Sequence, residues 1–116
     1  MSKATQFVDY LCELLAPLGR IRAKAMFGGH GIYCDERFFA LVADDTLYLK
    51  ADDETREAFI KAGQKPFTFV MKNAEQTMSY YTVPAEALDD FSEMKPWALL
   101  ALAAARRAAA KKTRKP

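Results

Sequence analysis

Hydrophobic residues in the first segment of the chain recur every three or four positions, which predicts an amphipathic helix over residues 3–16. A shorter helix is expected over about 53–62, where Asp52 or Asp53 can accept a hydrogen bond from a free amide at the helix start. A long, Ala-rich helix is expected to begin near Phe91. Each helix has an apolar side that must pack against another part of the chain.

Between these helices, apolar and polar residues alternate with the two-residue period of β-strands. Arg20, Arg22 and Lys24 alternate with small apolar residues, so the first strand has a cationic face. The glycine-rich run 28–31 that follows predicts a flexible turn, and a hairpin is the simplest arrangement. Five further strands are expected at 32–34, 38–43, 46–50, 66–71 and 77–83, with a polar link at 72–76.

This order of elements predicts an α+β fold, a two-layer domain in which N-terminal, middle and C-terminal helices pack on an antiparallel sheet of five to six strands. A sheet covered by helices on a single face should be polar on its other face. Here both alternations are apolar or aromatic, at Tyr33, Phe38, Phe39, Tyr48 and Tyr80. The second face therefore needs a cover, and the candidates are the C-terminal helix, a second copy of the chain or another partner.

The composition narrows the class of protein. The chain has 116 residues, of which 51% are hydrophobic and 28% charged, as expected for one globular domain and not for a disordered or collagen-like chain. No apolar run is long enough to span a membrane, so we expect a cytoplasmic protein without membrane contact. Cys12 and Cys34 are too few and too far apart for a disulfide framework or a zinc knuckle, so both are expected to be buried thiols. No metal and no cofactor are expected.

Few residues are candidates for catalysis. His30 is the only histidine, and Cys34, four positions further along, is the candidate nucleophile. On a straight strand the two residues lie roughly 13 Å apart, on one face but beyond hydrogen-bonding distance. The glycine run 28–31 lies between two strands, whereas phosphate-binding glycine loops join a strand to a helix, so a turn with positive φ is favoured. The alternative is a small enzyme or ligand-binding protein that uses this loop with His30 and Cys34.

The net charge of +2 conceals an uneven distribution. Residues 1–105 hold all 15 acidic and 11 of the 17 basic residues, whereas residues 106–116 hold six basic residues and no acidic one. We interpret residues 106–116 as a partly helical tail, fraying after Lys112, that binds nucleic acid weakly and without reading its sequence. The alternative is that its cations only keep the helix end soluble, and for the cations of the first strand the favoured alternative is a solvated strand face. The residues predicted to contact nucleic acid are Arg20, Arg22, Lys24, Arg106, Arg107, Lys111, Lys112, Arg114 and Lys115.

The segment Met26-Phe27-Gly28-Gly29-His30-Gly31-Ile32-Tyr33 resembles the N-terminal domain of the TfoX (Sxy) family of bacterial competence regulators. The resemblance covers about residues 7–105. Further segments that carry it are Phe39-Ala40-Leu41-Val42, Leu47-Tyr48-Leu49-Lys50, Pro66-Phe67, Met78-Ser79-Tyr80-Tyr81, Val83-Pro84 and Trp97-Ala98. The family motif, and the interaction residues that the resemblance suggests, are Met26, Phe27, Gly28, Gly29, Gly31 and Tyr33.

The resemblance implies an antiparallel α+β domain that forms dimers, acts in the transcriptional control of DNA uptake, and has no catalytic residue, metal or cofactor. Longer family members continue into a second helical domain, whereas here the family-like region, residues 1–105, is followed by the basic tail. We therefore predict a non-enzymatic binding module with a regulatory role in transcription or DNA transformation competence. The predicted partners are a second copy, bound through the aromatic face or a sheet edge, and a regulatory protein.

Overall fold

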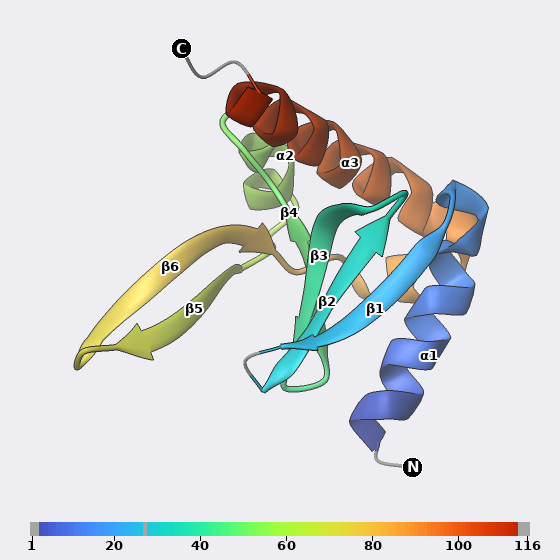
Figure 1. Cartoon of the computed structure of the whole chain (residues 1–116), viewed down its shortest axis with the longest axis horizontal. Coiled ribbons are helices and arrows are strands. Elements are labelled where there is room, and N and C mark those ends of the chain that lie inside the picture. Colours follow the sequence, from blue (N-terminus) through green and yellow to red (C-terminus); the bar gives the residue numbers. More distant parts are fainter. Residues whose placement is uncertain (1–2, 27, 114–116) are drawn as a thin grey trace.

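A computed structural model describes residues 3–26 and 28–113, and it confirms the predicted α+β fold. Within these residues the strands form one antiparallel sheet in the order β1-β2-β3-β4-β6-β5 (Figure 1). The elements follow one another as α1 (Lys3–Leu15), the 3-10 turn η1 (Ala16–Leu18), β1 (Ile21–Met26), β2 (Gly29–Cys34), β3 (Arg37–Ala43), β4 (Thr46–Lys50), α2 (Arg56–Lys61), β5 (Pro66–Met71), β6 (Ala74–Tyr81), the 3-10 turn η2 (Ala85–Leu88) and α3 (Phe91–Thr113).

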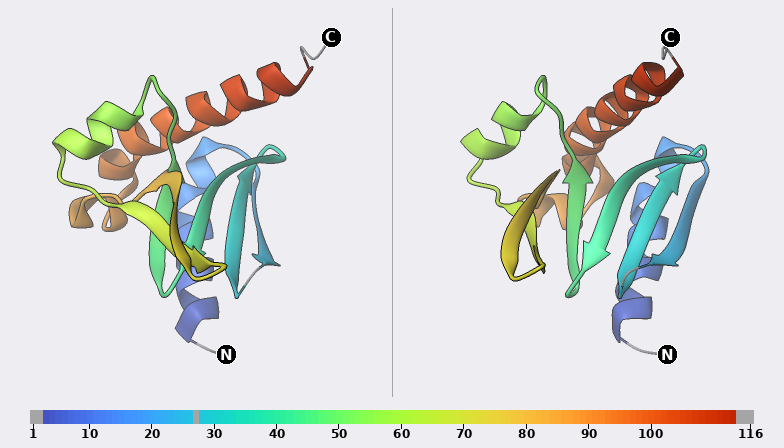
Figure 2. Two further views of the ribbon diagram at one scale, coloured as in Figure 1. Left: turned by 90° about the vertical axis from the view of Figure 1, so that its left-hand side faces the viewer. Right: turned by 60° about the vertical axis from the view of Figure 1, so that its left-hand side comes forward.

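The hydrophobic core lies between the sheet and the two long helices, α1 and α3, which pack on the same face of the sheet (Figure 2). Small residues on α3 allow its backbone to approach β3 and β4 closely. The sheet contributes larger side chains that fill the space between the layers. Core residues include Leu11 and Leu15 of α1, Ile32, Phe39, Leu47 and Leu49 of the sheet, and Ala98, Ala101 and Ala105 of α3.

An irregularity in the pairing of β2 with β3 changes which residues face the core. Ile32 pairs with Ala40, but Tyr33 pairs with Phe38, so Phe39 is an extra residue on β3. Phe39 and Ala40 are both fully buried in the core. The bulge therefore turns Phe39 toward the helices, and of the two neighbouring aromatic residues only Phe38 lies on the other face.

Three hairpins turn within two residues, each with positive φ at both positions, the conformation that matches the twist of paired strands. The turns are Asp35-Glu36, Asp44-Asp45 and Lys72-Asn73. The five-residue link predicted at 72–76 is therefore too long. Because this turn is so tight, β6 begins at Ala74 and not at residue 77.

The glycine run also differs from the predicted flexible turn. Only Gly28 lies in the turn, with a φ of 78°, whereas Gly29 and Gly31 belong to β2. A Cβ atom on Gly29 would stand 2.2 Å from the carbonyl oxygen of Val42 on β3. Glycine at position 29 thus allows close approach of backbone to backbone, and positive φ explains position 28 alone.

The helix boundaries also shift. The second helix, α2, begins at Arg56 and not at residue 53, because Asp52 accepts hydrogen bonds from the backbone amides of Glu54 and Thr55 in the preceding turn. The long helix, α3, spans Phe91–Thr113 and has Pro96 inside it, so Pro96 does not mark its start. In the described part of the chain, none of the helices is long and apolar enough to cross a membrane.

Candidate functional site

One face of the sheet is left without a helix. Among the described residues, α1 and α3 both lie on the opposite face, so the C-terminal helix does not cover the second face as one prediction allowed (Figure 2). We call the uncovered side the open face. Its side chains come from every strand: Arg22, Lys24 and Met26 of β1, Tyr33 of β2, Phe38 and Leu41 of β3, Tyr48 and Lys50 of β4, Met78 and Tyr80 of β6, and Phe67 and Phe69 of β5.

An aromatic row crosses one end of the open face. The ring centroids of Tyr33 and Phe38 lie 5.3 Å apart, and those of Phe38 and Tyr80 lie 5.8 Å apart. The guanidinium of Arg22 lies 4.7 Å from the centre of the Tyr33 ring, and the ammonium of Lys50 lies 5.1 Å from that of Tyr80. The row thus has a cation over the ring at each end, held there by cation–π attraction.

Beyond this row the open face contains an apolar hollow of about 470 Å³. Met26 comes from the edge strand β1, and Phe67 and Phe69 come from the opposite edge strand β5. Because both edges of the sheet line one hollow, the sheet is curved into a trough. The lining residues are Met26, Gly29, His30, Phe38, Leu41, Val42, Ala43, Phe67, Phe69 and Met78.

Most described residues of the predicted family motif meet at this trough. Met26 and Gly29 line the hollow, and Tyr33 belongs to the aromatic row. A Cβ atom on Gly31 would lie 2.6 Å from the terminal methyl of Met26 and 2.7 Å from the ring of Phe38, so these two side chains lie over the glycine. Gly28 lies in the exposed turn. Phe27 lies outside the described residues.

The candidate catalytic pair is not brought together. Both residues belong to β2, where strand alternation places them on one face, four residues apart and beyond hydrogen-bonding distance, and Cys34 is buried in the helix-covered core. Burial raises the pKa of the Cys34 thiol, the Asp35 carboxylate raises it further, and Arg106 acts in the opposite direction. A raised pKa disfavours the thiolate that a nucleophile requires. Cys34 is thus a buried thiol as predicted, while Cys12 is only partly buried.

The cationic face of β1 is partly neutralised by the neighbouring turn. Arg22 donates hydrogen bonds to the Glu36 carboxylate, with the closer nitrogen and oxygen 2.9 Å apart. The Arg20 backbone amide donates to a carboxylate oxygen of Asp35. The side chain of Lys24 is exposed between these pairs and Met26. Of the predicted contacts on β1, Arg22 therefore already has an acidic partner.

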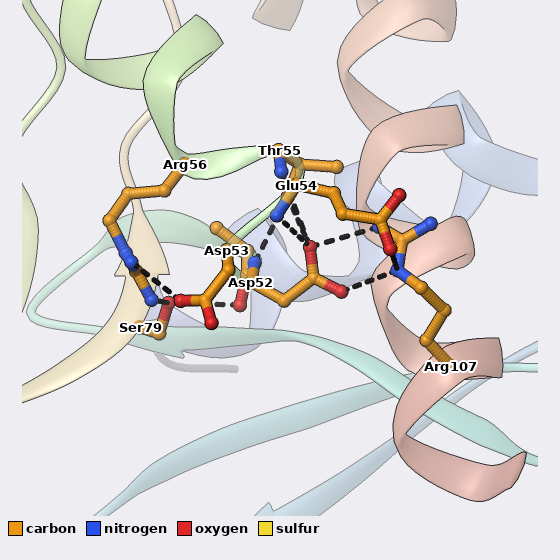
Figure 3. A network of polar contacts seen from close by, with 8 residues as sticks. Asp52, Asp53, Glu54, Thr55, Arg56, Ser79 and Arg107 are labelled. Atoms are coloured by element: carbon orange, nitrogen blue, oxygen red, sulfur yellow. Dashed lines mark hydrogen bonds and ion pairs between the residues drawn. The ribbon is translucent and has the colours of Figure 1, made fainter. Parts of the chain in front are cut away.

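The predicted basic tail is joined to the body of the domain by Arg107 (Figure 3). Its Nε donates to Asp52 Oδ2 at 2.6 Å and its Nη2 donates to Asp52 Oδ1 at 2.9 Å, while Nε also lies 3.1 Å from a Glu54 oxygen. These bonds hold the pKa of Asp52 at about 2, and they raise the pKa of Arg107. The expectation that Arg107 has no acidic neighbour is wrong, because Asp52, 55 positions away in sequence, and its neighbour Glu54 approach it in space.

The same network reaches β6. Arg56 pairs with Asp53 at 2.9 Å and donates to the hydroxyl of Ser79 at 3.3 Å (Figure 3). Ser79 in turn donates to the backbone oxygen of Ala51. Sequence reasoning named Asp52 or Asp53 as the cap of the second helix, but the N-cap of α2 is Thr55, and Asp52 instead accepts backbone hydrogen bonds in the preceding turn and pairs with Arg107. No local pattern signals a contact between residues so distant along the chain.

The remaining tail residues are distributed along the helix end. Arg106 and Lys111 are exposed on α3, and Lys112 belongs to the same helix. Arg114 and Lys115 lie outside the described residues. A search of the described chain finds no group of three or more His, Cys, Asp or Glu side chains that could hold a metal ion.

Residues 13–105 match the family model of the TfoX N-terminal domain. The chain is 33% identical over 85 residues to the DNA transformation protein TfoX1 of Aliivibrio fischeri, a match that covers 73% of this chain and 38% of that protein. It is 32% identical over 71 residues to Protein Sxy of Escherichia coli, covering 61% of this chain and 34% of that protein. The chain belongs to the TfoX N-terminal domain family, as its motif suggested. It spans little more than a third of the length of these curated relatives.

Proposed function

We propose that this chain is a non-enzymatic binding module with a regulatory role linked to transcription and DNA transformation competence. The names of the relatives, DNA transformation protein TfoX1 and Protein Sxy, support the biological process. The observation that carries the proposal of a binding module is the open face, a trough of aromatic and apolar side chains over which no described helix lies. Apolar patches of this kind on small domains are typical of binding surfaces.

A catalytic role has less support. Cys34 is the candidate nucleophile, yet it lies in the core with a raised pKa, four residues from His30 along the extended strand β2. A nucleophile and its base need to lie within hydrogen-bonding distance of each other, and usually near a cleft. The alternative of a small enzyme built on His30 and Cys34 is therefore not proposed.

The process is tested by deleting the gene in the source bacterium and measuring the frequency of DNA transformation. We expect the frequency to fall at least about tenfold and to be restored by the wild-type chain, whereas the open-face variant Phe38→Ala restores it poorly. Ile60→Ala is the matched control, since Ile60 is an exposed apolar residue on α2, outside the trough. An unchanged frequency after deletion would contradict the proposed process, and full rescue by Phe38→Ala would contradict the role of the open face.

We further propose that two copies pair through the β5 edge of the sheet. The two edge strands differ in charge: β1 carries Arg22 and Lys24, whereas β5 has no charged residue among its six positions. Charges on an edge strand oppose pairing with another strand, and their absence favours it. Val70 on β5 is 73% exposed, the largest exposure among the large hydrophobic residues of the described chain.

Sedimentation at tens of micromolar tests this pairing. We expect a dimer of the 13.0 kDa chain for the wild type and a monomer for Val70→Lys, because a lysine on the edge strand disfavours strand addition. Ile60→Lys adds the same charge at an exposed apolar residue outside the sheet and should remain dimeric. A wild-type monomer, or a dimer that survives Val70→Lys, would contradict pairing through β5.

A weak nucleic-acid contact is the second candidate function, favoured by the exposure of Arg106 and Lys111. Truncation after Ala105 would also remove the Arg107 pair with Asp52, so point substitutions are the cleaner test. We expect the double variant Arg106→Gln, Lys111→Gln to weaken duplex binding and to reduce the slope of log affinity against log salt by about 2. Lys61→Gln, on α2, is the control. Equal slopes would rule out the contact.

A further inference from the structure

The chemistry of the hollow in the open face indicates the class of ligand that it can take. Its volume of about 470 Å³ lies within the range of small-molecule sites, roughly 300–1,000 Å³. The side chains that lie on the open face around it are aliphatic, aromatic and methionine side chains, among them Met26, Leu41 and Phe67. Such a lining favours an apolar chain or ring, and the flexible methionines allow it to adapt to more than one shape.

Glycine forms part of the surface of this hollow. Side chains at positions 29 and 31 would point into space now taken by the Val42 backbone and by the side chains of Met26 and Phe38. Without side chains at Gly29 and Gly31, Met26 can lie across β2 toward Phe38. Met26 and Phe38 thus belong both to the lining and to the border with the aromatic row.

A cation lies at the β1 border of the hollow. Lys24 lies on the open face two residues before Met26, and it pairs in register with Gly31, over which Met26 and Phe38 lie. The six strands contain one acidic residue, Glu75, and strand alternation places it on the side opposite Met78. On the β1 side the Glu36 carboxylate is paired with Arg22, and the acidic turn Asp44-Asp45 follows the lining residue Ala43 at the end of β3.

We propose that the hollow binds an amphipathic anion, a small molecule with an apolar chain or ring and one carboxylate or sulfonate group. The apolar part occupies the hollow, and the anionic group lies at its border near Lys24. This inference rests on the proposed role of the open face as a binding surface and adds the chemical class of ligand. No bond is made or broken, so the site is one of recognition.

Fluorescence of 8-anilinonaphthalene-1-sulfonate, an aromatic sulfonate that brightens in apolar sites, tests the proposal on the full chain. We expect saturable binding with one probe per chain, and displacement of the probe by decanoate. Decanol and decyltrimethylammonium should compete more weakly, by about fivefold or more, because they lack the negative charge. Near-ultraviolet circular dichroism must stay native throughout, since partly unfolded chains also bind this probe.

Two pairs of variants locate the site. Ala43→Phe fills the hollow and should weaken probe binding at least about tenfold, whereas Ala62→Phe, on an exposed residue at the end of α2, should leave it unchanged. Lys24→Gln should weaken decanoate about fivefold without changing decanol, and Lys61→Gln is its control.

Several outcomes would overturn the proposal. These are absence of saturable probe binding, equal competition by decanol and decanoate, or full binding by Ala43→Phe. Binding to phosphatidylglycerol vesicles without binding of free decanoate would point to a membrane surface and also overturn it. Because these measurements use purified protein, their failure leaves the transformation assay unaffected, and the two proposals fail separately.

Discussion

The two faces of the sheet are both apolar, yet they differ in how completely they are buried. On the helix-covered face, Ile32, Phe39 and Leu49 have no exposed surface, because α1 and α3 exclude water from them. On the open face, Phe38 and Tyr48 are only partly buried, by their aromatic neighbours. The same residue types therefore have different consequences. Full burial stabilises the fold, while partial burial leaves a surface that can still gain contacts by binding.

The neighbouring residues Phe38 and Phe39 test this contrast most directly. We expect Phe39→Ala to lower the free energy of unfolding by about 3–5 kcal/mol, because it empties a fully buried site, and Phe38→Ala by about 1 kcal/mol. Urea unfolding of both variants measures the difference. Equal losses would show that the two faces contribute equally to stability.

Among the described aromatic residues of the open face, Tyr80 is buried, and its ionisation makes the stability of the fold depend on pH. Burial, and secondarily Tyr33, raises its pKa from 10.0 to about 12. The unfolded chain therefore loses this proton more readily, so the associated stability is complete below pH 10 and is lost as the pH rises toward 12. The loss should be about 2 kcal/mol. Urea unfolding at pH 9 and 12 checks it. Tyr80→Phe should remove this part of the pH dependence, and an unchanged dependence would contradict the assignment.

The neighbouring residues Gly28 and Gly29 allow turn strain to be compared with the close packing of two strands. Gly29→Ala should destabilise the fold by about 2 kcal/mol, because its Cβ would meet the Val42 carbonyl oxygen and the backbone would have to move. Gly28→Ala meets no neighbour and should cost about 1 kcal/mol, from its positive φ alone. Thermal or urea unfolding ranks the two variants. The reverse order would indicate that turn strain outweighs the close packing of the strands.

Breaking the ion pair between Asp52 and Arg107 should have a small effect on the free energy of unfolding, because both side chains are partly exposed to water. The unfolded carboxyl has a pKa of 3.8 and the folded one about 2, so its stabilisation is complete above pH 4 and is lost as the pH falls toward 2. Allowing for solvent screening, we expect about 1 kcal/mol. Unfolding free energies at pH 7 and pH 2 measure it. Arg107→Gln should abolish this part of the dependence, whereas Arg106→Gln should retain it.

Local signals were sufficient to predict most of the elements. The three- and four-residue spacing in α1 and the alternation of Leu47, Tyr48 and Leu49 in β4 follow from the geometry of single helices and strands, and both were predicted correctly. The aromatic residues on both alternations also predicted a second apolar face. The family motif added the class of domain. These features reside in short segments, where the pattern of side chains reports directly on the local backbone.

Other features depended on contacts between distant segments. The bulge that buries Phe39 arises from the register of β2 against β3, and the role of Gly29 arises from the approach of the Val42 carbonyl. The Arg107 pair with Asp52 forms because α3 crosses the turn before α2. A single sequence specifies the side chains that can meet, but which ones do meet is decided by how the packed layers fit. For this reason the chain alone predicted a second apolar face that needs a cover, whereas the absence of a described helix over it and its shape as a trough became visible only when the layers and both edges of the sheet were in place.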